Sequence, residues 1–185
     1  MGATVMGATL MGAAAKRLLL MRHAKSDWSD GSVADHDRPL NERGQASAPR
    51  MAAWIASQEL IPEVILSSAS VRTSQTLALM LNEWQSKTAF IGSEPEVHYI
   101  KELYLAPAAT LVSIASQHAT RGSVLVLAHN PGMEDAVSFL SGTYSEMPTA
   151  AVAVFEVVGR NWPTQWFDMK AWNLRSLVKP RDLGS

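Results

Sequence analysis

The chain has 185 residues, a length that suffices for one domain with a hydrophobic core. Hydrophobic residues make up 47% of it and charged residues 18%, values typical of a globular protein. The net charge of −1 creates no broad field for nucleic acid or an anionic membrane, so neither is expected as a partner. The lack of cysteine excludes disulfides, thiolate catalysis and cysteine-ligated zinc, and a cytoplasmic location is expected.

Residues 1–15 consist of a repeated five-residue unit that begins Met-Gly-Ala. The stretch is too short to span a membrane, and Lys16 and Arg17 follow it, whereas a signal peptide has its positive charges before the apolar region. Met6 stands where the myristoylation pattern requires Ser or Thr. We therefore expect a flexible leader, or the product of an upstream start codon, over residues 1–15 and a single domain over residues 16–185.

Buried strands alternate with amphipathic helices along the rest of the chain. Short apolar runs predict strands buried on both faces, and apolar residues three and four apart predict helices. The alternation predicts an α/β fold, a three-layer αβα sandwich around a mostly parallel sheet. In chain order the predicted elements are a strand over Leu18–Met21, a polar loop over Lys25–Pro39, a helix over Asn41–Ser57 that Pro49 is expected to kink, a strand over Val64–Leu66, a helix over Val71–Trp84, a strand over Glu96–Ile100, a helix over Pro107–His118, a strand over Val124–Ala128, a helix over Pro131–Leu140 that stops at Gly142, and two last strands over Ala151–Val158 and Gln165–Met169.

Arginine and histidine side chains follow three of the predicted strands. Arg22 and His23 end the first strand, Arg72 lies in the first turn of the helix after the second, and His129 ends the fourth. Ligands of open α/β sheets bind beyond the carboxyl ends of the strands, so we expect these four side chains to converge on one pocket. The N-termini of the following helices can add amide groups that favour anions.

These residue types suit the transfer of a phosphoryl group. A guanidinium fork matches phosphate oxygens and stays charged, which makes Arg22 and Arg72 candidate phosphate ligands. A neutral imidazole can attack phosphorus and form a covalent phosphohistidine, and a second imidazole can donate a hydrogen bond to the transferring group. Nearby arginines are expected to lower the pKa of His23 and keep it neutral and nucleophilic.

Four blocks carry a family resemblance, namely residues 20–28 (LMRHAKSDW), 37–44 (DRPLNERG), 67–76 (SSASVRTSQT) and 128–132 (AHNPG). In this order they resemble the histidine phosphatase superfamily of phosphoglycerate mutase-like proteins, and within it the SixA-type phosphohistidine phosphatases. The resemblance extends from about residue 16 to residue 183, and Ala24, where many members have glycine, is common in the SixA-type branch. It implies that His23 is the nucleophile, that Arg22 and Arg72 bind the phosphate, and that His129 stabilises the phosphoryl group. It also implies one antiparallel strand in the sheet, and neither a metal nor another cofactor.

Glu102 is the candidate general acid. Larger members of the superfamily carry a glutamate between the second arginine and the second histidine, and Glu102 follows the third predicted strand in that order. The alternative interpretation is an exposed loop carboxylate. The distinction matters because a phosphoramidate P–N bond needs less help from an acid than a phosphate ester, which leaves as an alkoxide.

The leading functional interpretation is hydrolysis of phosphohistidine in a phosphorylated protein, through a covalent phosphohistidine intermediate. One alternative is hydrolysis of small phosphomonoesters by the same residues. Another is a module that binds phosphoproteins without turnover, although loss of the nucleophile would be its signature and His23 is present. Lys25 and Arg38 remain open to two interpretations, recruitment of an anionic substrate or plain solvation.

Overall fold

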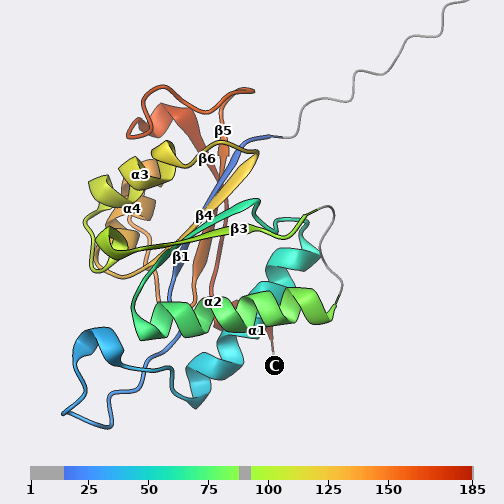
Figure 1. Ribbon diagram of the computed structural model, residues 1–185. Helices are drawn as coiled ribbons and strands as arrows, with labels where there is room; N and C mark the ends of the chain where they lie inside the picture. The colour runs from blue at the N-terminus through green and yellow to red at the C-terminus, as the bar shows by residue number, and fades with distance from the viewer. Residues whose placement is uncertain (1–14, 88–92, 185) are drawn as a thin grey trace, which may run out of the picture.

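One mixed sheet runs through the protein, whose computed structural model describes residues 15–87 and 93–184 (Figure 1). Within these residues six strands lie in the order β3-β2-β4-β1-β5-β6. β5 runs antiparallel to both of its neighbours, and the other five strands share one direction. The expected α/β fold, with a mostly parallel sheet and one antiparallel strand, is confirmed. The strands are β1 (Arg17–Arg22), β2 (Val64–Ser68), β3 (Glu96–Ile100), β4 (Ser123–Ala128), β5 (Val152–Val157) and β6 (Trp172–Val178).

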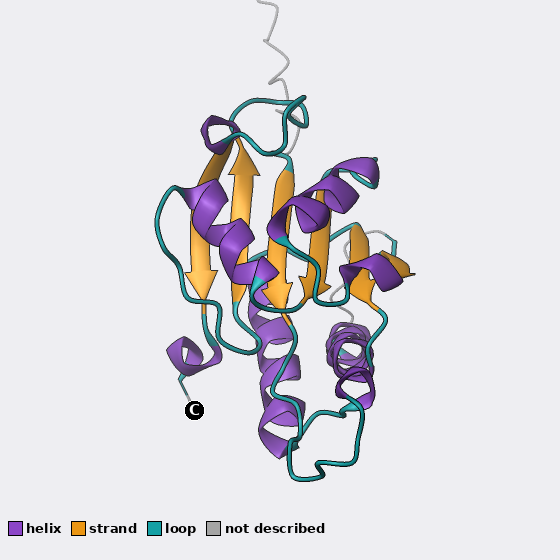
Figure 2. Cartoon of the chain, turned by 90° about the vertical axis from the view of Figure 1, so that its left-hand side faces the viewer, coloured by secondary structure: helices purple, strands orange, loops and turns teal. Residues whose placement is uncertain are grey.

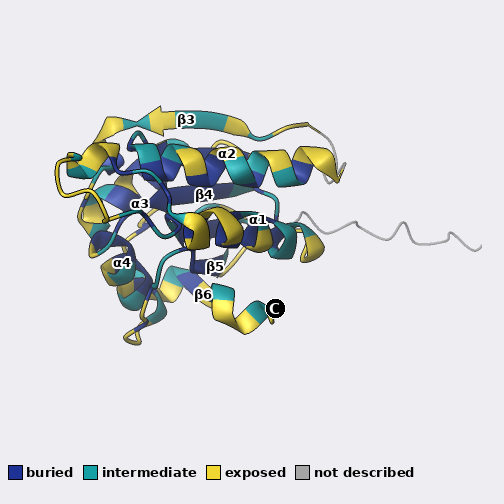
Figure 3. Cartoon of the chain, turned by 90° about the horizontal axis from the view of Figure 1, so that it is seen from below, coloured by how far each residue is buried: buried dark blue, intermediate teal, exposed yellow. Residues whose placement is uncertain are grey.

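Helices cover both faces of the sheet (Figure 2). Successive side chains of a strand point to opposite faces, and β1 shows the consequence. Its Leu19 and Met21 pack against α1 (Glu42–Ser57) and α2 (Val71–Ser86), whereas Leu18 and Leu20 pack against α3 (Ala108–Gln117) and α4 (Gly132–Ser141). The sheet is therefore the middle layer of three. Its inner strands are buried, as the dark β4 and β5 show in Figure 3, whereas the edge strand β3 is drawn in the colours of intermediate and exposed residues.

Local sequence explains where the helices begin and end. The Asn41 side chain caps α1 by accepting a hydrogen bond from the backbone N–H of Gly44, at 3.0 Å. α1 then continues through Pro49 to Ser57. α4 ends at Gly142, whose positive φ of 69° is a conformation that glycine adopts without strain. Single turns of 3-10 helix complete the chain: η1 (Asp35–Asp37), η2 (Lys101–Leu103), η3 (Met169–Ala171) and η4 (Pro180–Leu183).

The predicted last strand over Gln165–Met169 is wrong, because the last strand is β6, over Trp172–Val178. The buried Trp166 does not alternate along a strand but stacks on Trp162 and meets Trp172 edge-on in an aromatic cluster. The side chains of β6 do not alternate regularly between the two faces of the sheet, because its register against β5 shifts between Val154 and Phe155. This irregularity interrupts the period of two by which a strand is recognised.

Two further expectations concern the ends of the chain and the membrane. Residues 1–14, nearly all of the predicted leader, lie outside the described residues, so that prediction stays open. In the parts of the chain that the structure describes, no helix is long and apolar enough to cross a membrane.

The start of α4 tests how tightly the edge of the sheet is packed. A Cβ atom added at Gly132 would overlap the backbone carbonyl of Ala106. Because backbone has to move to relieve that overlap, Gly132→Ala is expected to lower the free energy of unfolding by about 1–3 kcal/mol, as measured by urea denaturation.

Gly31→Ala is the control for this substitution. A Cβ at Gly31 meets no atom within 4 Å, so its effect is expected to stay within about 0.5 kcal/mol. Equal stability of the two variants would show that the backbone at Ala106 can move to accommodate the Cβ without lowering the free energy of unfolding.

Candidate active site

A cavity of about 300 Å³ opens at the carboxyl ends of the parallel strands. Arg22, His23, Arg72 and His129, the four residues expected to converge, all line it. They come from the ends of β1 and β4 and from the first turn of α2, which follows β2. The other lining residues are Lys25, Ser26, Trp28, Asp35, Leu105, Asn130 and Thr149.

One hydrogen bond defines the chemistry of the buried His23. Its Nδ1 lies 2.7 Å from the backbone carbonyl oxygen of Ala24. A carbonyl oxygen can only accept, so Nδ1 carries the proton and Nε2 of the neutral ring carries the lone pair. Nε2 is therefore the ring nitrogen with the capacity for nucleophilic attack.

Three segments hold the backbone around this ring. The N–H of His23 donates to the carbonyl of Ala128 in β4 at 3.1 Å, and the carbonyl of His23 accepts from Ala150 at 3.0 Å. The next N–H, of Ala24, donates to the Thr76 hydroxyl of α2 at 3.1 Å. Strand, loop and helix thus fix the imidazole before any substrate arrives.

Arg72 connects His23 to a carboxylate. Its Nε donates toward Nε2 of His23 at 3.3 Å, and its Nη2 donates to the carboxylate of Asp35 at 3.0 Å. Its Nη1 also donates to the backbone carbonyl of Asp35. The buried guanidinium is therefore held in one orientation by its two partners. One donor points at the lone pair of His23, and the others point at oxygens of Asp35.

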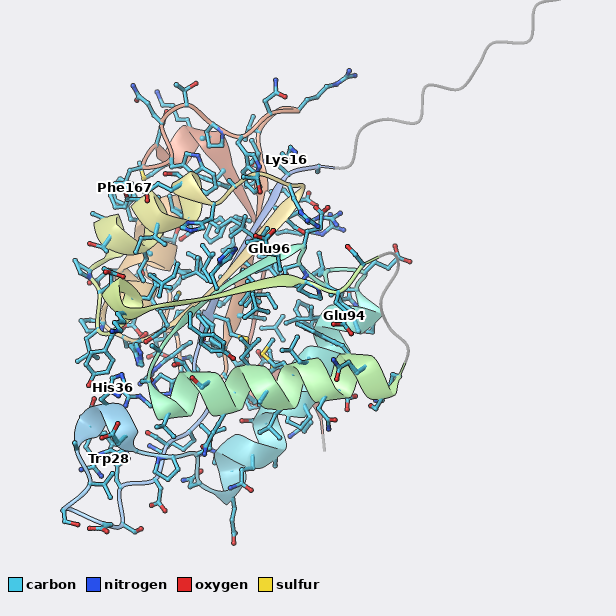
Figure 4. All side chains as sticks on the ribbon, in the orientation of Figure 1. Lys16, Trp28, His36, Glu94, Glu96 and Phe167 are labelled. Atoms are coloured by element: carbon cyan, nitrogen blue, oxygen red, sulfur yellow. The ribbon has the colours of Figure 1, made fainter. Side chains whose placement is uncertain are left out.

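Two residues were missed by sequence reasoning, namely Asp35, which lines the cavity, and Tyr104, which contacts Asp35. The Tyr104 hydroxyl donates to the Asp35 carboxylate at 2.6 Å, and this bond, together with Arg72, lowers the pKa of Asp35. Burial and the neighbouring Asp35 raise the pKa of Tyr104. Tyr104 follows β3, so the strand-end rule that selected Arg22 could have found it. Asp35 lies on the loop between β1 and α1, on which Figure 4 labels Trp28 and His36.

Arg22 is held from the other side of the cavity. Its Nη1 donates to the carbonyl of Met147 at 2.9 Å, and the N–H of Met147 donates to Glu134 at 3.0 Å. Burial lowers the pKa of Arg22, but a guanidinium stays charged at neutral pH. Its buried Nε has no hydrogen-bond partner among the described residues, which leaves a charged donor available for an anion.

His129 completes the group beside His23. The ring centroids of the two histidines are 5.0 Å apart, and Nε2 of His129 lies 2.9 Å from the Ser68 hydroxyl. Burial, with Arg72 and Arg22, lowers the pKa of His23 from 6.5 to about 4. Burial, with His23 and Arg72, lowers the pKa of His129 to about 3. Both rings are therefore neutral at pH 7.

The structure does not bring Glu102 to the cavity. It lies exposed in η2 and is absent from the residues that line the cavity. Arg38 is buried under Trp28, with its guanidinium 4.3 Å from the ring centroid, and donates to the carbonyl of Asp30 at 3.0 Å. It shapes the loop rather than standing free in solvent. Over residues 15–87 and 93–184, no group of three His, Asp or Glu side chains is placed to hold a metal ion.

Sequence relatives place this site in a family. The model of the histidine phosphatase superfamily (branch 1) matches residues 18–96. An uncharacterized chloroplastic protein of Arabidopsis thaliana is 34% identical over 176 residues, which cover 89% of this chain and 78% of the relative. An uncharacterized protein of Mycobacterium tuberculosis (strain H37Rv) is 30% identical over 162 residues, which cover 81% of this chain and 92% of the relative. The chain belongs to the histidine phosphatase superfamily.

Solved structures agree with this membership. An Agrobacterium tumefaciens protein assigned as the phosphohistidine phosphatase SixA has a TM-score of 0.72 and 31% identity, over 90% of this chain and 99% of that one. The protein histidine phosphatase SixA complexed with tungstate has a TM-score of 0.68 over 90% of this chain and 99% of that one, and at 22% identity it shows the shared fold alone. Family and neighbours together support a phosphatase.

The low histidine pKa values predict that the protein loses stability as the medium becomes acidic. Between about pH 6.5 and pH 4, His23 and His129 bind protons in the unfolded chain but not in the folded one. Because the unfolded state then binds more protons, the free energy of unfolding is expected to decrease as the pH is lowered across this window. Urea denaturation at a series of pH values measures the fall, and NMR titration of the imidazole protons measures the midpoints.

His23→Ala and His129→Ala assign the two resonances in that titration. Each variant is expected to remove one signal with a midpoint near 4 or 3. Midpoints near the ordinary value of 6.5 for both rings would mean that the cavity is well hydrated and that the histidines are not held neutral.

Proposed function

We propose that this protein hydrolyses phosphohistidine in phosphorylated proteins, through a covalent phosphate on His23. The observation that carries the proposal is the state of the one carboxyl group among the described residues that line the cavity. This group, Asp35, has a lowered pKa because Tyr104 and Arg72 donate hydrogen bonds to its carboxylate. At pH 7 it is ionised and has no proton to give.

The missing acid discriminates between leaving groups. A phosphate ester leaves as an alkoxide, which needs a proton in the transition state. The imidazole of a phosphohistidine needs less help, since solvent or the surroundings of the substrate can protonate it. Tyr104 does not replace the acid, because its pKa is raised and its proton is engaged by Asp35. The cavity therefore favours cleavage of a P–N bond.

Binding of the phosphoryl group is assigned to the two arginines. Arg22 offers its unpartnered Nε, and Arg72 offers a fork whose donors already point at anionic or electron-rich atoms. When phosphate oxygens accept the Nε–H of Arg72, the lone pair on His23 Nε2 is released for attack. Charge that develops on the equatorial oxygens is then neutralised by the two guanidinium groups.

In the first chemical step, the lone pair of His23 Nε2 forms a bond to phosphorus. The bond between phosphorus and the substrate imidazole breaks, and its electron pair stays on that imidazole nitrogen, which takes a proton from solvent. His129 lies beside the reacting ring and is assigned to donate a hydrogen bond to the transferring oxygens. The Nδ1 proton of His23 stays on the ring, held by the Ala24 carbonyl.

In the second step, water attacks the phosphorus of phospho-His23. The P–N bond to His23 breaks, the electron pair returns to Nε2, and the water becomes an oxygen of inorganic phosphate. Asp35 is the carboxylate among the described residues that line the cavity, and it is assigned to accept the proton that water loses. The neutral imidazole is thereby restored for the next turnover.

The rim of the cavity suits a protein substrate. Trp28 is 61% exposed and Leu105 is 49% exposed, and both line the opening. Exposed tryptophan beside arginine is a combination that protein interfaces use as an energetic anchor, and Trp28 stacks over Arg38 here. A small phosphate ester would leave this apolar rim unused.

Trapping of the phosphoenzyme tests the mechanism. Wild-type protein given a ³²P-phosphohistidine protein and quenched in base is expected to retain label, because phosphohistidine survives alkali. His23→Ala is expected to lose both label and turnover. His129→Ala keeps the nucleophile and loses stabilisation, so turnover should fall by about 10²–10³ while slow labelling persists.

Glu102→Gln is the matched control and also tests the candidate general acid. As an exposed carboxylate outside the cavity, it is expected to change kcat/KM by less than about twofold on phosphohistidine and on small esters. A loss of about a hundredfold on esters alone would restore the general-acid role. Absence of label under every quench would mean direct attack by water, and faster turnover of small esters than of phosphohistidine protein would overturn the proposed substrate.

A further inference from the structure

A second cavity, of about 100 Å³, lies beside the first and shares Lys25 and Thr149 with it. We refer to it as the cation pocket because four basic side chains line it. The proposed reaction uses none of these four. They are Lys25, Arg43, Lys179 and Arg181.

The fold assembles the cation pocket from segments far apart in the chain. Lys25 is held against the first turn of α1, where the Asn41 N–H donates to its carbonyl at 3.0 Å and a Cβ at Gly44 would overlap the same carbonyl. η4 comes from the end of the chain, and Arg50 of α1 donates to the carbonyl of Pro180 at 3.4 Å. Figure 1 shows the C-terminus beside α1. The pocket is thus a built feature of the native packing.

Positive charge in the cation pocket is only partly neutralised. Lys179 is 3.8 Å from Glu146, whose side chain is 64% exposed, and Arg181 is 3.9 Å from Asp182. Among the described residues no carboxylate lies within 4.0 Å of Lys25 or Arg43. In a chain of net charge −1, this concentration is local rather than a consequence of overall composition.

The position of Arg43 adds an independent reason to expect an anion. Arg43 lies in the first turn of α1, where the helix dipole is positive and a cation is disfavoured. Glu42 is the acidic residue of the same turn, but it does not pair with Arg43 within 4.0 Å. A bound anion in the pocket would be attracted by the dipole and by Arg43 together.

We propose that the cation pocket binds a second anionic group of the substrate, carried on the same molecule as the phosphoryl group in the first cavity. In the proposed phosphohistidine reaction, on which this inference rests, that group is an acidic or phosphorylated side chain near the phosphohistidine. The volume of about 100 Å³ suits one carboxylate or phosphate rather than a ring. Lys25, in the shared wall, lies between the two anions.

Substrate pairs that differ by one anionic group test the cation pocket. The first pair is a phosphohistidine peptide with aspartates beside the phosphorylated residue and the same peptide with asparagines. Wild type is expected to prefer the acidic peptide by about tenfold in kcat/KM at low salt, and the preference should shrink as salt is added. In Arg43→Gln/Arg181→Gln the preference is expected to fall to about one, with activity on the neutral peptide retained.

Two variants control for charge and for folding. Arg160→Gln/Lys170→Gln removes the same charge from exposed positions that do not line the pocket, and should keep the preference. Arg43→Lys/Arg181→Lys retains the positive charge and should keep most of the preference for the acidic peptide. No preference in wild type, persistence of the preference in Arg43→Gln/Arg181→Gln, or an equal loss in both glutamine double variants would overturn the inference.

A second pair separates this inference from the proposed function. It consists of a small phosphate monoester with a carboxylate and the same ester without one. If no phosphohistidine peptide is hydrolysed, the proposed function fails. A carboxylate preference on the small pair that Arg43→Gln/Arg181→Gln abolishes would still support the cation pocket and would identify its ligand as part of a small substrate. Lack of any anion preference on either pair overturns the cation pocket whichever substrate is turned over.

Discussion

The bond from His23 Nδ1 to the Ala24 carbonyl, at 2.7 Å, decides which nitrogen of the imidazole has the lone pair that the proposed mechanism uses. A neutral histidine has one protonated and one bare nitrogen, and an acceptor that can never donate selects between them. The carbonyl belongs to the next residue, and its segment is tied to α2 through the Ala24 N–H and the Thr76 hydroxyl. The reactive nitrogen is therefore set by the backbone at the end of β1, and the other site residues are arranged around it.

Burial and positive charge act in the same direction on this ring. Both favour the neutral form of His23, whose pKa falls to about 4. Two arginines in one cavity would be costly without a counter-charge, and Asp35 supplies one through its bond to Arg72 at 3.0 Å. A phosphoryl group that enters has to share or replace that carboxylate. The ion pair keeps the Arg72 fork oriented, and the bond from Arg72 to His23 engages the lone pair on Nε2.

The parts of the fold and of the site that could be predicted from the sequence are those that follow a simple rule of sequence pattern. Buried apolar runs marked β1, β2 and β4, and the strand-end rule brought Arg22, Arg72 and the two histidines to one edge. The chemistry of arginine and imidazole suggested phosphate binding and nucleophilic attack, and the family resemblance assigned these roles to the individual residues. Asp35 was not predicted as a site residue because it lies in a loop that has no periodic pattern. Its position depends on contacts with Tyr104 and Arg72 rather than on local sequence. Beyond β3 the chain makes the single turn η2, which leaves Glu102 exposed and brings the Tyr104 ring against that of His129. β6 was misplaced because its irregular pairing with β5 breaks the alternation of side chains.

A phosphoryl group looks alike on every substrate, so residues that contact only this group cannot tell one substrate from another. Discrimination has to come from the leaving group and from atoms farther along the substrate. In the proposed reaction the first source is the ionised state of Asp35, which leaves an alkoxide without a carboxylic acid to protonate it. The second source is the wall around the cavity, where Trp28 offers an apolar face and Lys25 a charge shared with the cation pocket. The reacting centre and the surfaces that choose its substrate are therefore separate parts of one edge of the sheet, and substitutions on those surfaces can alter substrate preference while His23 keeps its chemistry.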